Sequence, residues 1–434
     1  MNAVAESLRP YLESYAANSK PLAPALLALK ESAMRRAVAR GFPGARDEDW
    51  KYSSPVALEK RAFRSSATLT RFDAKDLADV AIPGLDAFRA VFVNGRFMAA
   101  LSELPEGARV TSLSSAGDSL NAALAVPAEW QDDTFLNLNT ALFQDGLLLE
   151  LDASAHIVKP LQLLHVSVLG EIASAHHPRF LLRLAADSRI MVIERYVGLE
   201  GAQHFTNAVT QIELAERAQL VHVRLQTESA QGFHVGRVLV RQAAHSGYRS
   251  HNLQLGGLWS RLDLHTRLEA TGAHAMLDGL YAVGSRQHVD NHTRVDHLAP
   301  GAVSEEIYRG VLDGHGRAVF NGKVVVAKHA VKTDAQQANH NLILSRGAEI
   351  DTKPELEIYA DDVKCSHGAS IGQLDEQQLF YLRSRGLDAA AARGLLIYAF
   401  ADKLLSRLPH PALAAHARRL LSAAVSQISV PEQT

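Results

Sequence analysis

The sequence predicts a mainly β protein in which a long array of stacked strands is flanked by helical segments at both ends. Between about residues 145 and 370, short segments of alternating apolar and polar residues recur, with Gly, Asn and Asp turns between them. Helical periodicity is confined to the chain before about residue 60 and after residue 372. Because no break divides the array into sandwiches of ~100 residues, we favour a solenoid of stacked strands over one large sandwich.

The N-terminal region predicts a helix followed by an anchored loop. Apolar residues between Leu22 and Val38 have near-helical spacing, and Gly41 and Pro43 supply the usual stop signals. The acidic segment "ARDEDWKYSSP" comes next and leads into Trp50, Lys51 and Tyr52, and we interpret it as a solvated loop with an aromatic anchor. The first strand signal is "FRAVFVNGRF", where Asn-Gly between two apolar runs predicts a hairpin.

The strand segments predict which side chains form the interior. In "QLVHVRLQ", Val221, Val223 and Leu225 alternate with polar residues, and in "SRLDLHTRLE" the leucines alternate with charged residues and a histidine. Similar segments follow as "EEIYRGVL", "RAVFNGKVVV", "HNLILS" and "ELEIYA". Because successive side chains of a strand point to opposite faces, we expect each segment to turn its apolar residues inward and its polar residues outward.

Three helices are predicted after residue 372. Asp375 is a suitable N-cap for the first, which ends near Gly386. Asp388 is a suitable N-cap for the second, and Pro411 suits the first turn of the third. The second helix has an apolar stripe formed by Leu395, Leu396, Phe400 and Leu404. The stripe packs on neighbouring helices or docks a partner, because so short a bundle makes a poor core by itself.

Composition narrows the class of function. The net charge of −2 over 434 residues gives no electrostatic reason to expect a nucleic-acid or anionic-membrane partner. A single cysteine excludes an internal disulfide framework and points to a reducing compartment. Glu6, Arg9 and Glu13 interrupt any signal-peptide core, and no uncharged stretch approaches the ~18 residues of a membrane span. We therefore expect a cytoplasmic protein.

The sequence lacks a nucleotide-binding P-loop and the usual motif of a zinc-dependent hydrolase. The segment "GRAVFNGKV" has the wrong glycine spacing for a P-loop, and Val324 stands where Ser or Thr would bind magnesium. The sequence contains no H-E-x-x-H or C-x-x-C motif. Histidines concentrate between residues 288 and 367, and a metal site is one interpretation of them. Because they lack a familiar ligand spacing, we favour hydrogen-bonded or solvated residues on the polar faces of strands: His288, His292, His297, His315, His329, His340 and His367.

The only cysteine, Cys365, lies two positions before His367 in "DDVKCSHGAS". On a strand these side chains share a face, with Cα atoms about 6.5–7 Å apart. A thiolate with an imidazole suits zinc, copper or iron–sulfur chemistry, and a catalytic Cys–His dyad is a second option. Two ligands are fewer than the about four that a tetrahedral site or a cluster requires, so further thiolates would come from another chain. A buried cysteine beside an unrelated surface histidine explains the pattern equally well.

One segment closely resembles the signature of a known family. It is "EIYADDVKCSHGASIGQLDEQQLFYLRSRGL", residues 357–387, and it is similar to the SufB/SufD family, the scaffold of the SUF iron–sulfur cluster assembly system. The segments "DEDWKYSSP" and "TDAQQANHNLILS" also resemble that family, so the likeness extends over most of the chain. The short length, the single cysteine and the helical N-terminal segment are similar to SufD rather than SufB members.

The resemblance implies an architecture and partners. It implies an N-terminal helical region at residues 1–85, a right-handed parallel β-helix at 86–372 and a C-terminal helical domain at 373–434. A SufB-like scaffold is expected to pair with the β-helix, and a SufC-like ABC ATPase, which would hydrolyse the ATP, is expected to bind the C-terminal helices. A homodimer in isolation is a further option. Nucleic-acid and membrane partners are not expected.

The resemblance also implies a site and leaves alternatives. His367 is the expected ligand of a nascent iron–sulfur cluster or iron shared with SufB, with Cys365 as an assisting or structural residue. A purely structural role beside SufB is one alternative. A carbohydrate-active β-helix enzyme is another, with Asp290, Asp296, Asp361 and Asp362 as its acidic residues. The aromatic content of 6% is low for stacking on sugars, and no motif identifies a flavin site.

Overall fold

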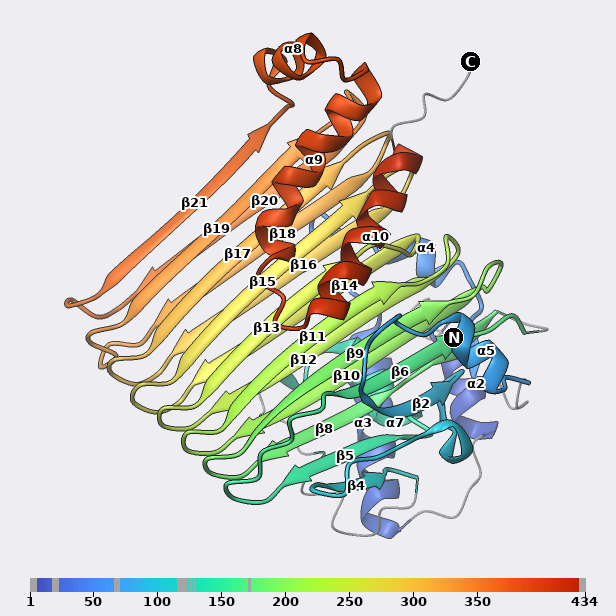
Figure 1. Ribbon diagram of the computed structural model, residues 1–434. Coiled ribbons are helices and arrows are strands. Elements are labelled where there is room, and N and C mark those ends of the chain that lie inside the picture. The colour runs from blue at the N-terminus through green and yellow to red at the C-terminus, as the bar shows by residue number, and fades with distance from the viewer. Residues whose placement is uncertain are drawn as a thin grey trace.

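The computed structural model is a solenoid of stacked strands with helices packed on its outer faces (Figure 1). It describes residues 6–17, 23–65, 71–114, 124, 127, 130–170 and 173–428. The predicted class, mainly β with helical ends, is confirmed. Within these ranges, every helix is too short or too polar to cross a lipid bilayer.

The solenoid has two facing sheets, which we term sheet A and sheet B. The strands of sheet A are β1 (Arg64–Ser65), β4 (Arg109–Ser112), β5 (Gly146–Leu151), β7 (Ser174–His176), β8 (Arg179–Leu184), β10 (His204–Leu214), β12 (Phe233–Gln242), β14 (Trp259–Leu268), β16 (His288–His297), β18 (Arg317–Val326) and β20 (Glu349–Ile358). The strands of sheet B are β2 (Phe88–Val93), β3 (Arg96–Phe97), β6 (Leu161–Ser167), β9 (Arg189–Gly198), β11 (Gln219–Thr227), β13 (Gly247–Gln254), β15 (His274–Val283), β17 (Val303–Leu312), β19 (Asp334–Ile343) and β21 (Lys364–Gly372).

Strands from β8 onward alternate between the sheets, so each coil contributes one strand to each of them. From β8 onward, neighbouring strands within a sheet are parallel and come from successive coils. In sheet A, Trp259 pairs with His288, which pairs with Arg317, so each of these coils takes 29 residues. Parallel strands need such a return crossing, and here the opposite sheet provides it.

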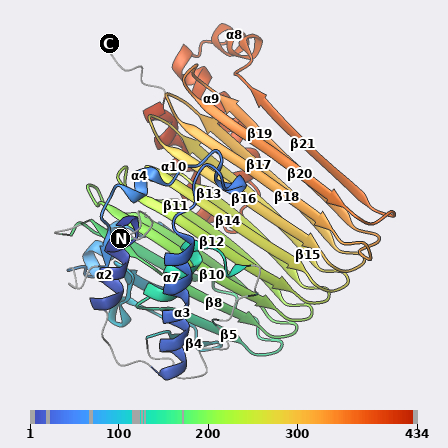
Figure 2. The same cartoon turned by 180° about the vertical axis from the view of Figure 1, so that it is seen from behind.

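The N-terminal helices lie mainly on the outer face of sheet A (Figure 2). They are α2 (Arg9–Ala17), α3 (Pro24–Arg40), η1 (Glu48–Trp50), α4 (Val56–Glu59), α5 (Ala74–Asp79), η2 (Ala99–Leu101) and α7 (Thr134–Leu142). The end of α3 is as predicted, at Gly41, whose φ of 71° disfavours other residues. Trp50 is the predicted anchor: it is buried and stacks on Phe135 of α7, with ring centroids 5.3 Å apart.

The three C-terminal helices begin as predicted. They are α8 (Glu376–Ser384), α9 (Ala389–Leu405) and α10 (Pro411–Ile428). The side chains of Asp375 and Asp388 accept hydrogen bonds from backbone N–H groups in the first turns of α8 and α9. In Figure 1, α9 and α10 lie across the outer face of sheet B. Nε of Arg407, just after α9, is 2.9 Å from the Asp278 carboxylate, and its Nη2 is 2.7 Å from Glu305.

The predicted apolar stripe of α9 does not form one exposed surface. Leu404 and Phe400 belong to the core that the C-terminal helices share with Val311 and Leu342 of sheet B. Leu395 remains exposed. The short bundle therefore obtains its core from the sheet as well as from its own helices.

The prediction that apolar residues point inward is correct in β14 of sheet A and wrong in strands of sheet B, where Leu342 of β19 also packs beneath the C-terminal helices. The leucines of β14, including Leu264, point into the main core between the sheets as predicted. In β11 the direction is reversed, because Val223 and Leu225 belong to the core beneath the C-terminal helices. His222 and Arg224 of β11 are buried between the sheets instead. Both faces of β11 are covered, so alternation alone does not distinguish inside from outside there.

Candidate functional site

The last coil of the solenoid leaves two strand edges open. β20 pairs with β18 and β21 pairs with β19, and among the described residues no strand pairs with their other edges (Figure 1). The side chains that would meet the interior of a further coil are therefore at the end surface. They are Ile350, Thr352, Pro354, Leu356 and Ile358 of β20 and Cys365, His367, Ala369 and Ile371 of β21. This end is mainly apolar, with one imidazole and one thiol in it.

Cys365 and His367 lie on the same, inward-facing side of β21. Their partners in β19 are Ala335 and Gln337, and both partners are buried between the sheets. Cys365 is half-buried against the main core, whereas His367 is exposed. Within the described ranges the imidazole of His367 has no hydrogen-bond partner. The strand therefore brings the two side chains to one face, next to the open edge.

The electrostatics of this end favour the imidazole over the thiol as a metal ligand. Burial, together with the negative charge of Asp334, raises the pKa of the Cys365 thiol above its usual range. A thiol binds iron or zinc only after losing its proton, whereas an imidazole binds in its neutral form. Among the described residues, no group of three or more His, Cys, Asp or Glu side chains is arranged to hold a metal ion. This face can supply one nitrogen and one sulfur, which fits part of a shared site.

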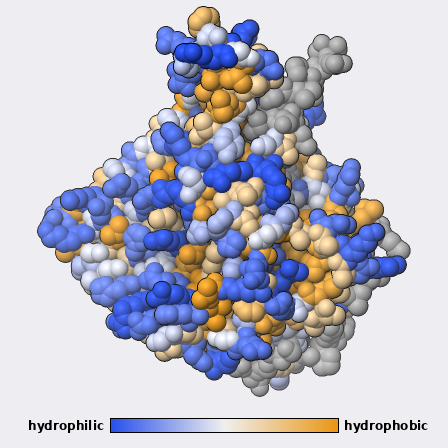
Figure 3. Space-filling model, viewed as in Figure 1, coloured by the Kyte–Doolittle hydropathy of each residue, from blue (hydrophilic) through white to orange (hydrophobic). Residues whose placement is uncertain are grey.

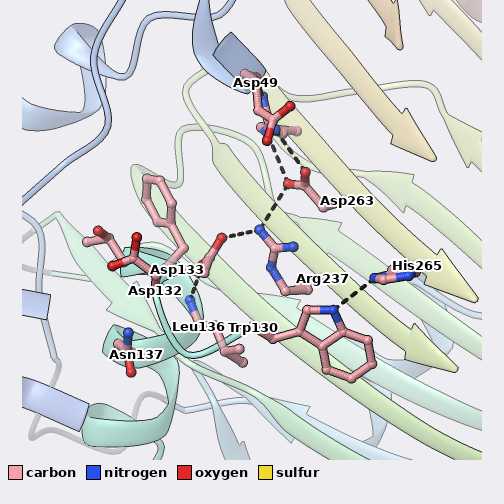
Figure 4. Close-up of polar contacts among 12 residues, drawn as sticks. Asp49, Trp130, Asp132, Asp133, Leu136, Asn137, Arg237, Asp263 and His265 are labelled. Atoms are coloured by element: carbon pink, nitrogen blue, oxygen red, sulfur yellow. Dashed lines mark hydrogen bonds and ion pairs between the residues drawn. The ribbon is translucent and has the colours of Figure 1, made fainter. Parts of the chain in front are cut away.

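Apart from the open end, the outer face of sheet A carries a groove of about 760 Å³ (Figure 4). Figure 4 shows Arg237 between Asp133 and Asp263, to both of which it is ion-paired. Trp130 Nε1 donates a hydrogen bond to Nδ1 of His265 over 2.8 Å. Every Arg and Lys side chain that lines the groove is ion-paired within the chain. The ion pairs Arg237–Asp133 and Lys353–Glu48 fasten the N-terminal region to sheet A. Among the described residues, no cation that lines the groove is left unpaired for an anionic ligand.

The interior of the middle coils contains a polar network that the sequence analysis missed. Tyr196, Thr210 and Arg224 donate hydrogen bonds to the Glu194 carboxylate, and Nε2 of His222 lies 2.9 Å from it. Burial alone would raise the pKa of Glu194, but His222, Arg224 and Thr210 hold it well below its usual range. The network is thus a buried anion surrounded by donors.

Glu228 forms a second buried centre in the same interior. Thr206 and Gln226 donate hydrogen bonds to its carboxylate over 2.7 and 2.9 Å. Nε2 of His204 and Nδ1 of His234 lie 3.2 and 3.0 Å from its oxygens. Burial opposes the charge, yet His234 and His204 hold the pKa of Glu228 well below its usual range. Both networks connect strands of sheet A with strands of sheet B.

The four acidic residues considered for a carbohydrate-active enzyme do not meet in one place. Asp290 is buried and lies 2.8 Å from a guanidinium nitrogen of Arg261. Asp296 lies on the same strand, 2.7 Å from Nε2 of His265. Asp361 and Asp362 lie in the turn between β20 and β21.

Comparisons with known proteins cover both the N-terminal region and the solenoid. Residues 167–400 match the family model described as SUF system FeS cluster assembly, SufBD core domain, and residues 4–163 match the SufBD protein N-terminal region. Iron-sulfur cluster assembly protein SufD of Escherichia coli is 36% identical over 85% of this chain and 86% of its own length. The iron-sulfur cluster assembly SufBD family protein slr0076 of Synechocystis is 32% identical over 88% and 87%. Protein ABCI7, chloroplastic, of Arabidopsis thaliana is 27% identical over 96% and 88%.

Proposed function

The chain belongs to the SufBD family of iron–sulfur cluster assembly proteins, and we propose that it is a scaffold subunit that completes a cluster-building site with a SufB-like partner. The observation behind this proposal is the open last coil, with His367 and Cys365 on its inward face. ATP hydrolysis belongs in this proposal to a SufC-like ABC ATPase, since this chain has no P-loop.

The open end fits a partner that is itself a solenoid. Its two edge strands, β20 and β21, are 10 and 9 residues long, and no other strand of the described chain pairs with their outer edges. An added strand satisfies such groups, and an apolar inner layer is covered only by another inner layer. A SufB-like member of the same family would supply both. A second copy of this chain is the competing occupant.

The inward face of β21 supplies ligands to the shared site in this proposal. His367 binds iron or the edge of the nascent cluster through a ring nitrogen, and thiolates of the SufB-like partner complete the ligand set. Cys365 assists once a bound cation lowers the pKa of its thiol. Covering by the partner would exclude water from the site, which strengthens these interactions.

The exposed apolar residues of the C-terminal helices support docking of the ATPase. Phe380 and Tyr381 of α8 are 74% and 57% exposed, and Leu395 of α9 is 46% exposed. Figure 3 shows apolar surface in this part of the molecule, at the top of the view. Clustered exposed apolar residues are typical of protein–protein contacts. We therefore assign the SufC-like contact to α8 and the adjoining start of α9.

The attachment of α9 to sheet B provides a route from the ATPase to the open end. Arg407 is ion-paired with Asp278 of β15 and with Glu305 of β17, and β17 pairs with β19, which pairs with β21. When ATP draws two SufC-like subunits together, the helices would pull on these strands and reshape the shared site. An interface that stays unchanged while the ATPase binds and hydrolyses ATP would refute the coupling.

The test is co-expression of this chain with its SufB-like and SufC-like partners, as wild type, His367→Ala and the control His156→Ala. His156 is an exposed residue in the part of the solenoid remote from β21. Complex yield, iron and acid-labile sulfide are measured after anaerobic purification. An intact His367→Ala complex that loses iron and sulfide, beside an unaffected control, supports the ligand role. Undiminished iron and sulfide would leave this chain a purely structural partner.

A further inference from the structure

The inward-facing column that ends in His367 continues into the interior as Gln337 of β19 and Glu306 of β17. The strand registers pair Glu306 with Gln337 and Gln337 with His367. Nε2 of Gln337 donates a hydrogen bond to Oε2 of Glu306 over 2.8 Å, and both side chains are buried. The candidate ligand therefore lies directly beside a buried amide that is itself held by a buried carboxyl group.

The orientation of the Gln337 amide is constrained from two sides. Its nitrogen is engaged by Glu306, and a Cβ added to Gly322 of the opposite sheet would lie only 2.2 Å from that nitrogen. Its oxygen, Oε1, is buried and has no hydrogen-bond partner in the described part of the chain. Buried carbonyl oxygens are nearly always hydrogen-bonded in native proteins, so we expect this oxygen to accept a hydrogen bond from a donor.

His367 is the residue that the strand register pairs with Gln337 on the side of the open edge, and its ring carries an N–H donor. A histidine that binds a metal through one nitrogen usually donates its other N–H to a carbonyl or carboxylate, which fixes the tautomer and the ring orientation. The ring of His367 has no hydrogen-bond partner within the described chain. Each group thus lacks the partner that the other can provide.

We propose that Gln337 and Glu306 are positioning residues for His367: Glu306 holds the amide nitrogen of Gln337, and the amide oxygen accepts the ring N–H of His367 once a partner covers the last coil. The other ring nitrogen is then free for iron. The inference rests on the proposed ligand role of His367. The Gln337 amide would determine which ring nitrogen of His367 binds iron, whereas the open strand alone would leave both nitrogens available.

The first test uses the full complex with Gln337→Leu, which removes the acceptor without shortening the side chain greatly. The matched control is Asn341→Leu, because Asn341 is a buried amide on the same strand whose partner in β21 is Ile371. Anaerobic titration with ferrous iron is expected to give roughly tenfold weaker binding for Gln337→Leu than for the wild type, as for other outer-shell partners of metal ligands. Asn341→Leu should bind iron like the wild type.

The second readout is the tautomer of the His367 ring. This chain is labelled with ¹⁵N-histidine, assembled with its partners and studied by magic-angle-spinning NMR, and a His367→Gln spectrum identifies the signal. One tautomer is expected in the wild type and a mixture in Gln337→Leu. Glu306→Leu should also give the mixture, whereas Glu306→Gln should restore the single tautomer because its amide oxygen still accepts from Gln337.

The outcomes separate this inference from the proposed function. If His367→Ala loses iron but Gln337→Leu keeps the wild-type affinity and tautomer, His367 is a ligand and the positioning role is wrong. If His367→Ala keeps its iron, the ligand role itself fails, whatever the tautomer. Equal loss of iron in Gln337→Leu and Asn341→Leu would show that general damage to the interior, and not positioning, is responsible.

Discussion

The middle coils and the last coil of the solenoid place polar side chains on the same inward face, but they satisfy them differently. Glu194 in the middle is surrounded by donors from its own coil, the next coil and the opposite sheet. His367 in the last coil has Gln337 on one side and an open edge on the other. In the middle, coils on both sides and the opposite sheet supply these donors, whereas the last coil has a neighbouring coil on one side only among the described residues.

The largest effect is expected from breaking the middle network. Glu194→Ala leaves Arg224 and His222 buried without their anion, which should lower the free energy of unfolding by ~3–5 kcal/mol. His367→Ala, on the exposed end, should change it by less than ~0.5 kcal/mol. Denaturant unfolding of the isolated chain measures both. Similar losses of unfolding free energy in the two variants would show that the middle coils and the last coil do not differ in this respect.

The next effect concerns the apolar layer of the open end. Ile371→Lys places a charge where a partner coil would cover the face, so it should weaken SufB-like binding by ~2–5 kcal/mol, the usual cost of a buried unpaired charge at an interface. Stability of the isolated chain should not change, because Ile371 is exposed there. Val158→Lys, at another exposed position, is the control for added charge. Binding of Ile371→Lys with wild-type affinity would place the partner elsewhere.

Some features of this structure could be predicted from the sequence, and others could not. The helix caps at Asp375 and Asp388 and the hairpin at Asn94 were predictable, because local backbone chemistry determines them. The helix α7 was not predicted, since it is buried along its whole length and lacks the solvent-exposed face of an ordinary amphipathic helix. The reversed faces of β11 were not predictable from alternation, because α9 and α10 cover its outer side.

Part of the candidate site could likewise be predicted from the sequence, and part could not. The shared face of Cys365 and His367 follows from their spacing on a strand, whereas the residues that lie beneath them do not. Phe233 pairs with Trp259 after 26 residues, but Arg317 pairs with Glu349 after 32, so the coil length varies. Without a fixed repeat, Gln337 and Glu306 could not be aligned with His367 from the sequence.

A smaller, pH-dependent effect is expected one coil inside the end. Burial raises the pKa of Glu306 to about 7, although the hydrogen bond from Gln337 and the nearby Thr293 hydroxyl act to lower it. The folded protein then binds this proton more tightly than the unfolded chain, so Glu306 costs stability as the pH rises from about 4.5 through 7. Glu306→Gln should be more stable than wild type by ~1–3 kcal/mol at pH 8 and nearly equal at pH 5. Parallel pH profiles of unfolding would contradict this.

The smallest effect is expected at the C-terminal helices. Phe380→Ala removes an exposed apolar side chain, so it should weaken binding of the SufC-like ATPase by ~1–2 kcal/mol and leave the unfolding free energy unchanged. Leu169→Ala, also exposed and far from α8 in the chain, is the matched control. Isothermal titration with the purified ATPase compares the variants. Equal affinities would exclude α8 from the contact.

The central claim is that the open end of this solenoid supplies a nitrogen ligand to a site shared with the partner. Iron K-edge X-ray absorption of the purified complex tests it directly, with wild-type chain compared with His367→Ala at equal iron loading. We predict that the spectrum of the variant lacks one nitrogen neighbour of iron at about 2.0–2.1 Å, the metal–imidazole distance typical of such sites. Identical spectra would show that iron does not contact His367 and would contradict the claim.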